Sequence, residues 1–469
     1  MALPNFRLGL VVDHPRRDLM GLVLVACALV ERGAEVVLVP LYQQGIDVPL
    51  LKLDGLLVNY ARLNNKPLLE AYRTLGLPVF VLDTEGGVLS EDGADAPKNW
   101  ARLVRDSGLA ACVTRHFFWG HEVRRAFLES GAFPPEAVAV TGCPRYDLCH
   151  PEWRATLGWD RQGYVLVNTN FSAINPLFTR STEEETRAFL SVGMAEDYAR
   201  RLLQEMRSVF ARYLELLQAL IAENSNRQFV VRPHPFENRR VYHDRFSHLA
   251  NAVIEPRGDI LNVINNARCV LHLNCGSAVE ANLLGRLPIQ LEPINTEVLR
   301  SHTPLPGRLS YLPASVDDIG YAIRHVEDLS ASFDFEGNID RLIRPYFGPL
   351  DGRAAVRVAE AILTCLAEGS DFGPRRSLAL SLTSGLHRPS GPQRLQGVLA
   401  NLVGSRMVAA LRQSLRPARA DKRFSAARVE ALLATLSACS GEEATLQVAH
   451  ARHPVTGVPL ESLWLRRGR

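Results

Sequence analysis

Two loops in the second half of the chain carry residue types that bind phosphate. Residues 232–235 (Arg-Pro-His-Pro) follow one short apolar run, and residues 274–280 (Asn-Cys-Gly-Ser-Ala-Val-Glu) follow another about forty residues later. In an open parallel sheet, ligands bind beyond the carboxyl ends of the strands, so two such loops indicate one pocket. The prolines stiffen the loop around His234, and Gly276-Ser277 is expected to begin a helix whose free N–H groups can hold an anion. The pattern predicts a nucleotide-binding site.

Alternating strands and helices are expected to position these loops. In the first half, buried strands are expected at residues 8–12, 35–39, 55–59, 79–82, 111–114 and 137–140, with amphipathic segments between them. A second series begins at 164–168, passes through one charged helix over 185–223, and continues with strands at 228–231, 252–254, 269–273 and 288–291. This order predicts an α/β protein with two Rossmann-like, doubly wound domains facing a cleft, which is the GT-B architecture.

Turn residues mark the joint between the two series. Residues 142–145 (Gly-Cys-Pro-Arg) stand between a strand and the polar stretch 151–163. The expected organisation is an N-terminal acceptor and catalytic domain over 1–150, a linker over 151–163, a nucleotide-binding domain over 164–369 and a basic, mostly helical extension over 370–469. Pro144–Asp147 is expected to be a rigid hinge with an interaction between Arg145 and Asp147.

Composition sets the class of protein. The chain has 469 residues, 47% of them hydrophobic and 22% charged, which is typical of globular proteins and long enough for two domains. There is no run of eighteen apolar residues and no signal-peptide pattern at the N-terminus, so a cytoplasmic protein is expected. The eight cysteines are scattered without a Cys-x-x-Cys pair, which argues against a zinc site or a disulfide framework.

Six segments, taken in order, match a known family. They are Val-Asp-His-Pro-Arg-Arg-Asp-Leu at 12–19, Asp-Thr-Glu-Gly-Gly at 83–87, Gly-Cys-Pro-Arg-Tyr-Asp-Leu at 142–148, Val-Leu-Val-Asn-Thr-Asn-Phe-Ser at 165–172, Arg-Pro-His-Pro-Phe-Glu at 232–237, and the loop 274–280. The chain resembles bacterial surface carbohydrate biosynthesis proteins, GT-B-like proteins of capsule and surface-glycan gene clusters. The resemblance covers roughly residues 7–350 and leaves the tail after about residue 370 uncovered.

This family is similar to the bacterial sialyltransferases and capsular Kdo transferases of GT-B type. Those enzymes carry an acidic-acidic-Gly motif that supplies the catalytic carboxylate and a His-Pro motif that binds the CMP of the donor. Glu85-Gly86 resembles the first motif, and His234-Pro235 resembles the second. The resemblance implies a catalytic carboxylate at Glu85 or at Asp83, because Thr84 stands where relatives often have the first acid.

Sugar transfer from a nucleotide needs a carboxylate near the acceptor hydroxyl and cationic or N–H donors around the departing phosphate. The candidates for donor binding are Arg232, His234, Asn274, Gly276, Ser277, Glu280 and Asn170. Glu280 is expected to accept the ribose hydroxyls, and Arg17 and Asp18 are the candidates for acceptor binding. No Asp-x-Asp motif follows a strand, so neither a metal nor another cofactor is expected.

Each candidate also has a structural interpretation. Residues 83–87 are compatible with a plain turn after a strand, in which Asp or Thr caps the turn and glycine takes a positive φ. His234 alone is compatible with a buried structural histidine. Glu280 is compatible with a first-turn acid that complements the helix dipole.

The tail differs from the body in charge. Residues 371–469 contain 15 Lys and Arg against 6 Asp and Glu, a net charge of +9. Apolar residues recur at helical spacing over 394–415 with arginines among them, which predicts one amphipathic helix, and the end of the chain from Trp464 has the same basic, apolar character. Such a tail can lie on an anionic membrane at the inner face, or pack on the core or on a partner protein. Nucleic-acid binding is not expected, because the tail has few aromatic residues and the body is acidic.

The sequence thus predicts a metal-independent glycosyltransferase that moves a sugar from a nucleotide donor, expected to be a CMP-linked acidic sugar, to a surface-glycan acceptor. The alternatives are a UDP-sugar transferase or nonhydrolysing epimerase, a CDP-glycerol-type glycerophosphotransferase, and a non-catalytic GT-B scaffold.

Overall fold

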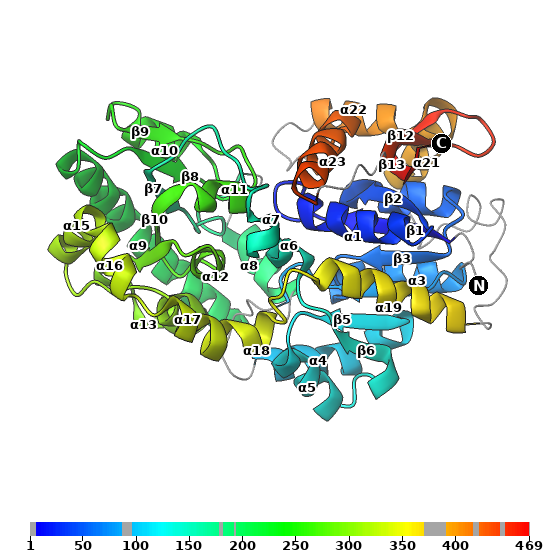
Figure 1. Cartoon of the computed structure of the whole chain (residues 1–469), viewed down its shortest axis with the longest axis horizontal. Helices are drawn as coiled ribbons and strands as arrows, with labels where there is room; N and C mark the ends of the chain where they lie inside the picture. The colour runs from blue at the N-terminus through cyan, green and yellow to red at the C-terminus, as the bar shows by residue number, and fades with distance from the viewer. Residues whose placement is uncertain are drawn as a thin grey trace.

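The computed structural model describes residues 6–86, 96–177, 182–191, 194–369, 391–415, 422–440 and 446–468. Figure 1 shows two α/β lobes side by side, with the C-terminal extension lying on the N-terminal lobe. Each lobe is built on its own largely parallel sheet. The predicted fold class, α/β with two Rossmann-like domains in a GT-B arrangement and a largely helical C-terminal region, is confirmed.

The N-terminal sheet contains six parallel strands from the first part of the chain, in the order β2-β1-β3-β4-β5-β6. The strands are β1 Arg7–Val12, β2 Glu35–Pro40, β3 Gly55–Val58, β4 Val79–Leu82, β5 Arg115–Phe118 and β6 Val138–Val140. The helices around them are α1 Leu19–Glu31, α2 Gln44–Asp47, α3 Lys66–Thr74, α4 Ala96–Asp106, α5 His121–Glu129, α6 Pro144–Asp147 and α7 Pro151–Arg154. Most residues of these strands are Val, Leu or Phe and are buried, as a parallel sheet covered by helices requires.

The second sheet is parallel throughout, in the order β11-β10-β7-β8-β9. Its strands are β7 Tyr164–Asn168, β8 Phe229–Arg232, β9 Ala252–Ile254, β10 Ala267–His272 and β11 Leu287–Gln290. The helices are α8 Thr182–Ser191, α9 Glu196–Glu223, α10 Arg240–Phe246, α11 Ile260–Asn265, α12 Ser277–Leu283, α13 Glu297–His302, α14 Pro304–Arg308, α15 Val316–Arg324, α16 Val326–Ser332, α17 Phe335–Asn338 and α18 Arg344–Phe347. The loops after β7, β8 and β10 lie at one edge of this sheet, because the strands are parallel and adjacent.

Helix α19 (Ala354–Glu368) returns to the N-terminal lobe and packs against α1, as Figure 1 shows. The carboxylate of Asp147 in α6 accepts hydrogen bonds from Ala354 N–H and Ala355 N–H, at 2.9 and 2.8 Å. These are unpaired donors of the first turn of α19, so a residue 207 positions earlier caps the helix. The predicted interaction between Asp147 and Arg145 is wrong, because this carboxylate binds α19 instead.

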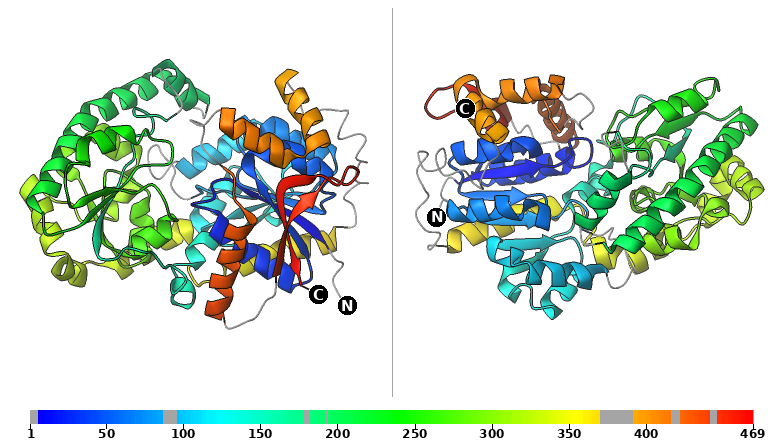
Figure 2. Two further views of the ribbon diagram at one scale, coloured as in Figure 1. Left: turned by 90° about the horizontal axis from the view of Figure 1, so that it is seen from above. Right: turned by 180° about the vertical axis from the view of Figure 1, so that it is seen from behind.

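The C-terminal extension contains three helices in the described residues, α21 Gly391–Val403, α22 Ser405–Leu415 and α23 Ala426–Ser440. It also contributes a hairpin, β12 Leu446–Arg452 and β13 Pro459–Arg467, which joins the N-terminal sheet antiparallel to β2. Figure 2 shows this hairpin beside the first strands of the chain. Sequence reasoning missed the hairpin and grouped Trp464 with a membrane-binding tail, but Leu463 and Leu465 of β13 are buried in the core.

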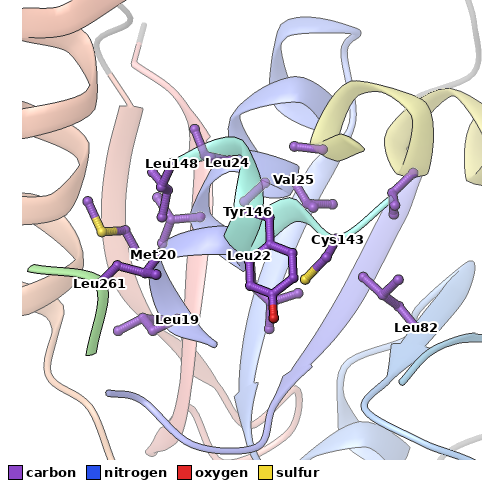
Figure 3. Close-up of a cluster of buried hydrophobic side chains, with 14 of the residues drawn as sticks. Leu19, Met20, Leu22, Leu24, Val25, Leu82, Cys143, Tyr146, Leu148 and Leu261 are labelled. Atoms are coloured by element: carbon purple, nitrogen blue, oxygen red, sulfur yellow. The ribbon is translucent and has the colours of Figure 1, made fainter. Parts of the chain in front are cut away.

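Apolar side chains join the two lobes. Figure 3 shows Leu261 of α11, in the C-terminal lobe, next to Leu19 and Met20 at the start of α1. Tyr146 of α6 belongs to the same cluster and lies between the lobes. The two lobes therefore pack against each other through this cluster.

Three predicted elements differ from the structure. The expected strand at 111–114 is wrong, because Leu109–Cys112 forms a 3-10 turn and the strand that pairs with β4 is Arg115–Phe118. The expected helix over 185–223 is two helices, since Ala195 is extended at φ −66° and ψ 141° and begins α9. The expected helix over 394–415 breaks at Gly404, whose φ of +88° and contact with Pro459 leave no room for a side chain.

Candidate active site

The predicted site residues lie in and beside one cleft between the lobes. The cleft has a volume of about 390 Å³ and is lined by residues from the loops after β1, β4, β7, β8 and β10. Of the predicted residues, its walls contain Arg17, Glu85, Asn170, Arg232, His234, Asn274, Gly276, Ser277 and Glu280. Asp18 and Asp83 line a smaller adjoining cavity, which shares Thr84, Trp119 and Arg145 with the cleft. The acidic loop and the His-Pro loop thus line the same cleft.

The acidic loop follows the last residue of β4. Asp83 is buried, accepts two hydrogen bonds from Arg62 at 3.0 and 3.2 Å, and accepts a third from Glu85 N–H at 2.8 Å. The carboxylate of Glu85 bonds to Arg17 at 3.1 Å and to Arg62 at 3.2 Å, and its side chain is 49% exposed. Asp83 therefore shapes the loop, and Glu85 presents its carboxylate to the cleft.

The two carboxylates differ in pKa because their surroundings differ. Burial raises the pKa of Asp83, although Arg62 partly opposes this change. Burial also raises the pKa of Glu85, but Arg17 and Arg62 outweigh it and bring the pKa below its usual value. Glu85 is therefore ionised at neutral pH.

Arg17 connects the acidic groups of the N-terminal wall. Its guanidinium bonds to Asp13 at 3.0 Å, to Asp18 at 2.8 Å and to Glu85 at 3.1 Å. Asp18 precedes α1 and also accepts a hydrogen bond from His14 N–H at 2.9 Å. Both predicted acceptor residues are thus held in an ion-pair network at the carboxyl end of β1.

The buried carboxylate of Glu237 holds the His-Pro loop against the loop after β7. Glu237 accepts hydrogen bonds from Thr169 Oγ1 at 2.8 Å and from Phe171 N–H at 2.7 Å, and also contacts the hydroxyl of Tyr242. Thr169 in turn accepts a hydrogen bond from His234 N–H at 3.0 Å. The loops after β7 and β8 are therefore one hydrogen-bonded unit that sets the position of His234.

The ring of His234 has a defined tautomer. Its Nδ1 accepts a hydrogen bond from Phe236 N–H at 3.3 Å, so in the neutral ring Nε2 carries the proton. Burial lowers the pKa of His234 to about 4, with a further contribution from Arg17. His234 is therefore a neutral N–H donor at physiological pH, which suits contact with a phosphate oxygen.

The loop after β10 is held in place by contacts of polar side chains. Asn274 has a positive φ of 49°, and its side-chain amide pairs with that of Asn295 at 2.9 Å. Asn170 donates from its side chain to the carbonyl oxygen of Asn274 at 3.4 Å. Ser277 begins α12 as predicted, and its hydroxyl contacts Cys275 Sγ at 3.3 Å.

Arg232 and Glu280 have protein partners inside the cleft. Arg232 donates to the carbonyl oxygen of Gly258 at 2.8 Å, and burial lowers its pKa to about 10. Glu280 pairs with Arg145 at 3.2 Å and accepts a hydrogen bond from Tyr146 at 3.5 Å. A ribose contact by Glu280 stays a prediction, and it would compete with this ion pair.

Arg145 is a cleft residue that sequence reasoning assigned to a hinge. It reaches Glu280 in the C-terminal lobe and lies 3.9 Å from Asp18 in the N-terminal lobe. A side chain at Gly21 would come within 2.8 Å of the Arg145 backbone, so glycine allows α1 to approach α6 closely. The Pro-Arg motif therefore links the two walls of the cleft.

Other cleft residues were also missed. Asp13 and His14 line the cleft and belong to the segment 12–19, for which the sequence predicted only Arg17 and Asp18 as site residues. Arg62 follows β3 and bonds to Asp83 and Glu85 of the acidic loop, and its position after a strand was the signal in the sequence. Lys422 lines the cleft from the C-terminal extension, where the sequence offers no motif. Among the described residues, no group of three or more potential ligands is positioned to hold a metal ion.

The chain arrangement is similar to that of several solved structures. MnaA from S. aureus with UDP is 15% identical with a TM-score of 0.47, over 76% of this chain and 96% of that chain. The UDP-GlcNAc 2-epimerase from Neisseria meningitidis, bound to UDP-GlcNAc, is 14% identical with a TM-score of 0.46, over 76% and 99%. The H548A form of the wall teichoic acid polymerase TagF is 8% identical with a TM-score of 0.46, over 78% and 90%. The sequence matches no protein-family model and no curated protein.

Proposed function

We propose that this chain is a metal-independent enzyme of surface-glycan synthesis that binds a nucleotide-activated sugar in the interdomain cleft and transfers the sugar to a glycan acceptor. The observation that carries the proposal is the shared cleft, in which Glu85 comes from one lobe and His234 from the other. The C-terminal wall provides the Nε2–H donor of His234 for the phosphate, and Gly276 and Ser277 line the same wall. The N-terminal wall provides the carboxylate. This division fits a donor held on one side and an acceptor on the other.

Glu85 is the proposed catalytic carboxylate, and Asp83 is the group that orients its loop. Glu85 is ionised but weakly basic, because Arg17 and Arg62 stabilise its charge. An anionic substrate group that binds Arg17 would weaken one of the two guanidinium contacts of Glu85 and so raise its basicity, while the bond to Arg62 stays. This requirement favours an acidic sugar, and a CMP-linked acidic sugar is therefore the first donor to test.

A UDP-sugar 2-epimerase is the second candidate. Such an enzyme must remove and return a proton at a carbon of the sugar, and this chemistry needs acid and base groups around one pocket. Asp13 and Glu85 both line the cleft and supply two carboxylates there. Incubation with UDP-N-acetylglucosamine in the absence of an acceptor distinguishes the candidates, because only the epimerase changes the sugar.

Nucleotide binding is the first test of the proposal. One of CMP, CDP, UDP and GDP is expected to raise the melting temperature, because a ligand at a hundredfold excess over its Kd stabilises the native state by about 3 kcal/mol. Glu85→Gln is expected to keep this shift and to lower the rate of sugar transfer on the order of a hundredfold or more. Glu70→Gln, on the exposed face of α3, is the matched control and should change neither quantity.

Two results would contradict the proposal. If none of the four nucleotides shifts the melting temperature, the chain is better described as a non-catalytic GT-B scaffold. If Glu85→Gln transfers sugar at the rate of the unchanged protein, Glu85 is not the catalytic group.

The exposed face of α21 and α22 is a further part of the proposed function. Among the described residues, no helix is long and apolar enough to cross a membrane. We propose that this face binds an anionic membrane surface from the cytoplasmic side, where lipid-linked acceptors would be presented to the cleft.

A further inference from the structure

The C-terminal extension places a lysine in the interdomain cleft. Lys422 lies just before α23, and its side chain is only 6% exposed. Its Nζ donates to Asp13 Oδ1 at 2.8 Å and lies 5.2 Å from the centre of the Phe236 ring. Asp13 belongs to the N-terminal lobe and Phe236 to the His-Pro loop of the other lobe, so one ammonium group contacts both walls.

Arg428, in the same segment, also contacts both lobes. Its guanidinium donates to the carbonyl oxygen of Pro15 at 3.0 Å and pairs with Asp259 at 2.8 Å. Pro15 precedes α1, whereas Asp259 precedes α11 in the C-terminal lobe. The extension therefore contacts both lobes at two separate places beside the cleft.

The segment that carries Lys422 is anchored firmly in the N-terminal lobe. Phe424, Val429, Leu433 and Leu436 are buried in the core that includes α1. Helix α23 packs against α1 and α7, and Figure 1 shows it above the start of α1. The backbone that carries Lys422 is thus held in place by buried side chains of the same segment.

The charges of the N-terminal wall show what Lys422 contributes. Asp13, Asp18 and Glu85 all bind the single guanidinium of Arg17. Arg62 also bonds to Glu85, but Lys422 is the second cation bonded to Asp13. Without Lys422, a buried carboxylate next to the His-Pro loop would share one arginine with two other acids. The cleft would then have one cation fewer for the anionic group of a donor, beside Arg16, Arg17, Arg145 and Arg232.

A buried ion pair adds little net stability compared with an apolar pair of the same volume, because both charges lose their hydration. The contact between Lys422 and Asp13 is therefore better explained by the charge and position that it gives to the cleft. We propose that the C-terminal extension is part of the substrate site and that Lys422 is a positioning residue, which holds and neutralises Asp13 so that the anionic group of a nucleotide-activated donor can bind. This inference rests on the proposed function, because it assumes a nucleotide in the cleft.

The test uses the full-length protein and whichever of CMP, CDP, UDP and GDP binds it most tightly. Lys422→Met keeps the length of the side chain and removes its charge, and it is expected to weaken nucleotide binding by on the order of tenfold or more. Lys422→Arg keeps the charge and is expected to recover most of the affinity. Glu430→Gln, on an exposed position of α23, is the control and should bind as the unchanged protein does.

A double variant separates a positioning role from a purely structural one. Asp13→Asn in the Lys422→Met background removes the carboxylate that Lys422 neutralises, so the double variant is expected to bind nucleotide more tightly than Lys422→Met alone. It also covers the case in which Lys422→Met fails to fold, because it leaves no unpaired charge at this place.

The inference is overturned if Lys422→Met binds nucleotide as tightly as the unchanged protein. It is also overturned if Lys422→Arg, or the double variant, is as weak as Lys422→Met. If the unchanged protein binds none of the four nucleotides, the proposed function falls together with this inference. Binding that is insensitive to Lys422 would remove the inference alone.

Discussion

His234 shows how a single side chain acquires a role from its loop. The flanking prolines and the hydrogen bond to Thr169 fix the backbone, and Phe236 N–H fixes the tautomer. His234 and Arg232 could be predicted because a motif directly after an apolar strand is recognisable from the sequence alone. Sequence reasoning missed Asp13, Arg145 and Lys422, because their partners are distant in the sequence. Lys422 is 409 residues from Asp13, and Arg145 is 135 residues from Glu280.

At the residue scale, we predict that the donor N–H of His234 determines nucleotide affinity. His234→Ala is expected to weaken binding by on the order of tenfold to a hundredfold, because a hydrogen bond to a charged group is lost. His234→Gln is expected to lose less, since its amide can donate in place of Nε2. Calorimetric titration at pH 7.5 measures both, with the exposed His243→Ala of α10 as the control. Unchanged affinity in His234→Ala would disprove the phosphate role of this loop.

At the scale of elements, the strands of both sheets were predictable wherever the apolar run in the sequence is the same segment that pairs with a neighbouring strand. β5 was displaced because Ala111-Cys112-Val113 is apolar, while the true strand begins with Arg115 and His116. Only pairing with β4 reveals that His116 points into an aromatic cluster, stacked on Phe118 with ring centres 4.3 Å apart. The hairpin β12–β13 was missed for a similar reason, because its partner β2 lies more than 400 residues away.

This placement of His116 predicts a pH dependence of stability. Burial lowers the pKa of His116 from 6.5 to about 3. The unfolded chain therefore takes up a proton at His116 below pH 6.5 while the native state does not. The contribution of His116 to the free energy of unfolding, fully present above pH 6.5, is lost as the pH falls from 6.5 toward 3. His116→Leu removes this group. The free energy of unfolding of the variant, relative to that of the unchanged protein, should increase by about 1.4 kcal/mol for each pH unit below 6.5.

Urea unfolding at several pH values between 7 and 5 measures this difference. The exposed His121→Gln of α5 is the control, because the pH dependence of its stability should match that of the unchanged protein. If the His116→Leu protein and the unchanged protein lose stability in parallel, His116 does not resist protonation in the native state.

At the scale of the whole molecule, the extension connects three parts of the chain. β13 extends the N-terminal sheet, Lys422 before α23 and Arg428 within α23 contact both lobes, and α21 and α22 lie on the outside. The sequence predicted a basic helical region here, but its attachment could not be predicted, because the contacts join it to Asp13, Pro15 and Asp259. The domain boundaries drawn from the sequence stay a prediction, and α19 and the extension both pack on the N-terminal lobe.

The outer face of α21 and α22 is apolar and basic, which leads to a prediction about membranes. Its most exposed apolar residues are Leu395, Val398, Leu402, Met407, Leu411 and Leu415, between 55% and 73% exposed. Residues 391–415 contain three arginines, of which Arg406 is exposed, and no Asp or Glu, so this segment complements anionic lipid rather than a basic partner. We expect the protein to sediment with vesicles of phosphatidylcholine and phosphatidylglycerol, and less so with vesicles of phosphatidylcholine alone.

Leucines of this face supply the apolar part of the binding energy, so the paired substitution Leu402→Ser and Leu411→Ser should release the protein from the vesicles. Leu312→Ser is the matched control, because Leu312 is 51% exposed in the other lobe and should not contribute. Raising the salt concentration should also weaken binding, since the arginines act through screened charge. Equal sedimentation with both kinds of vesicle, or with the paired variant and the control, would show that this face does not bind an anionic membrane.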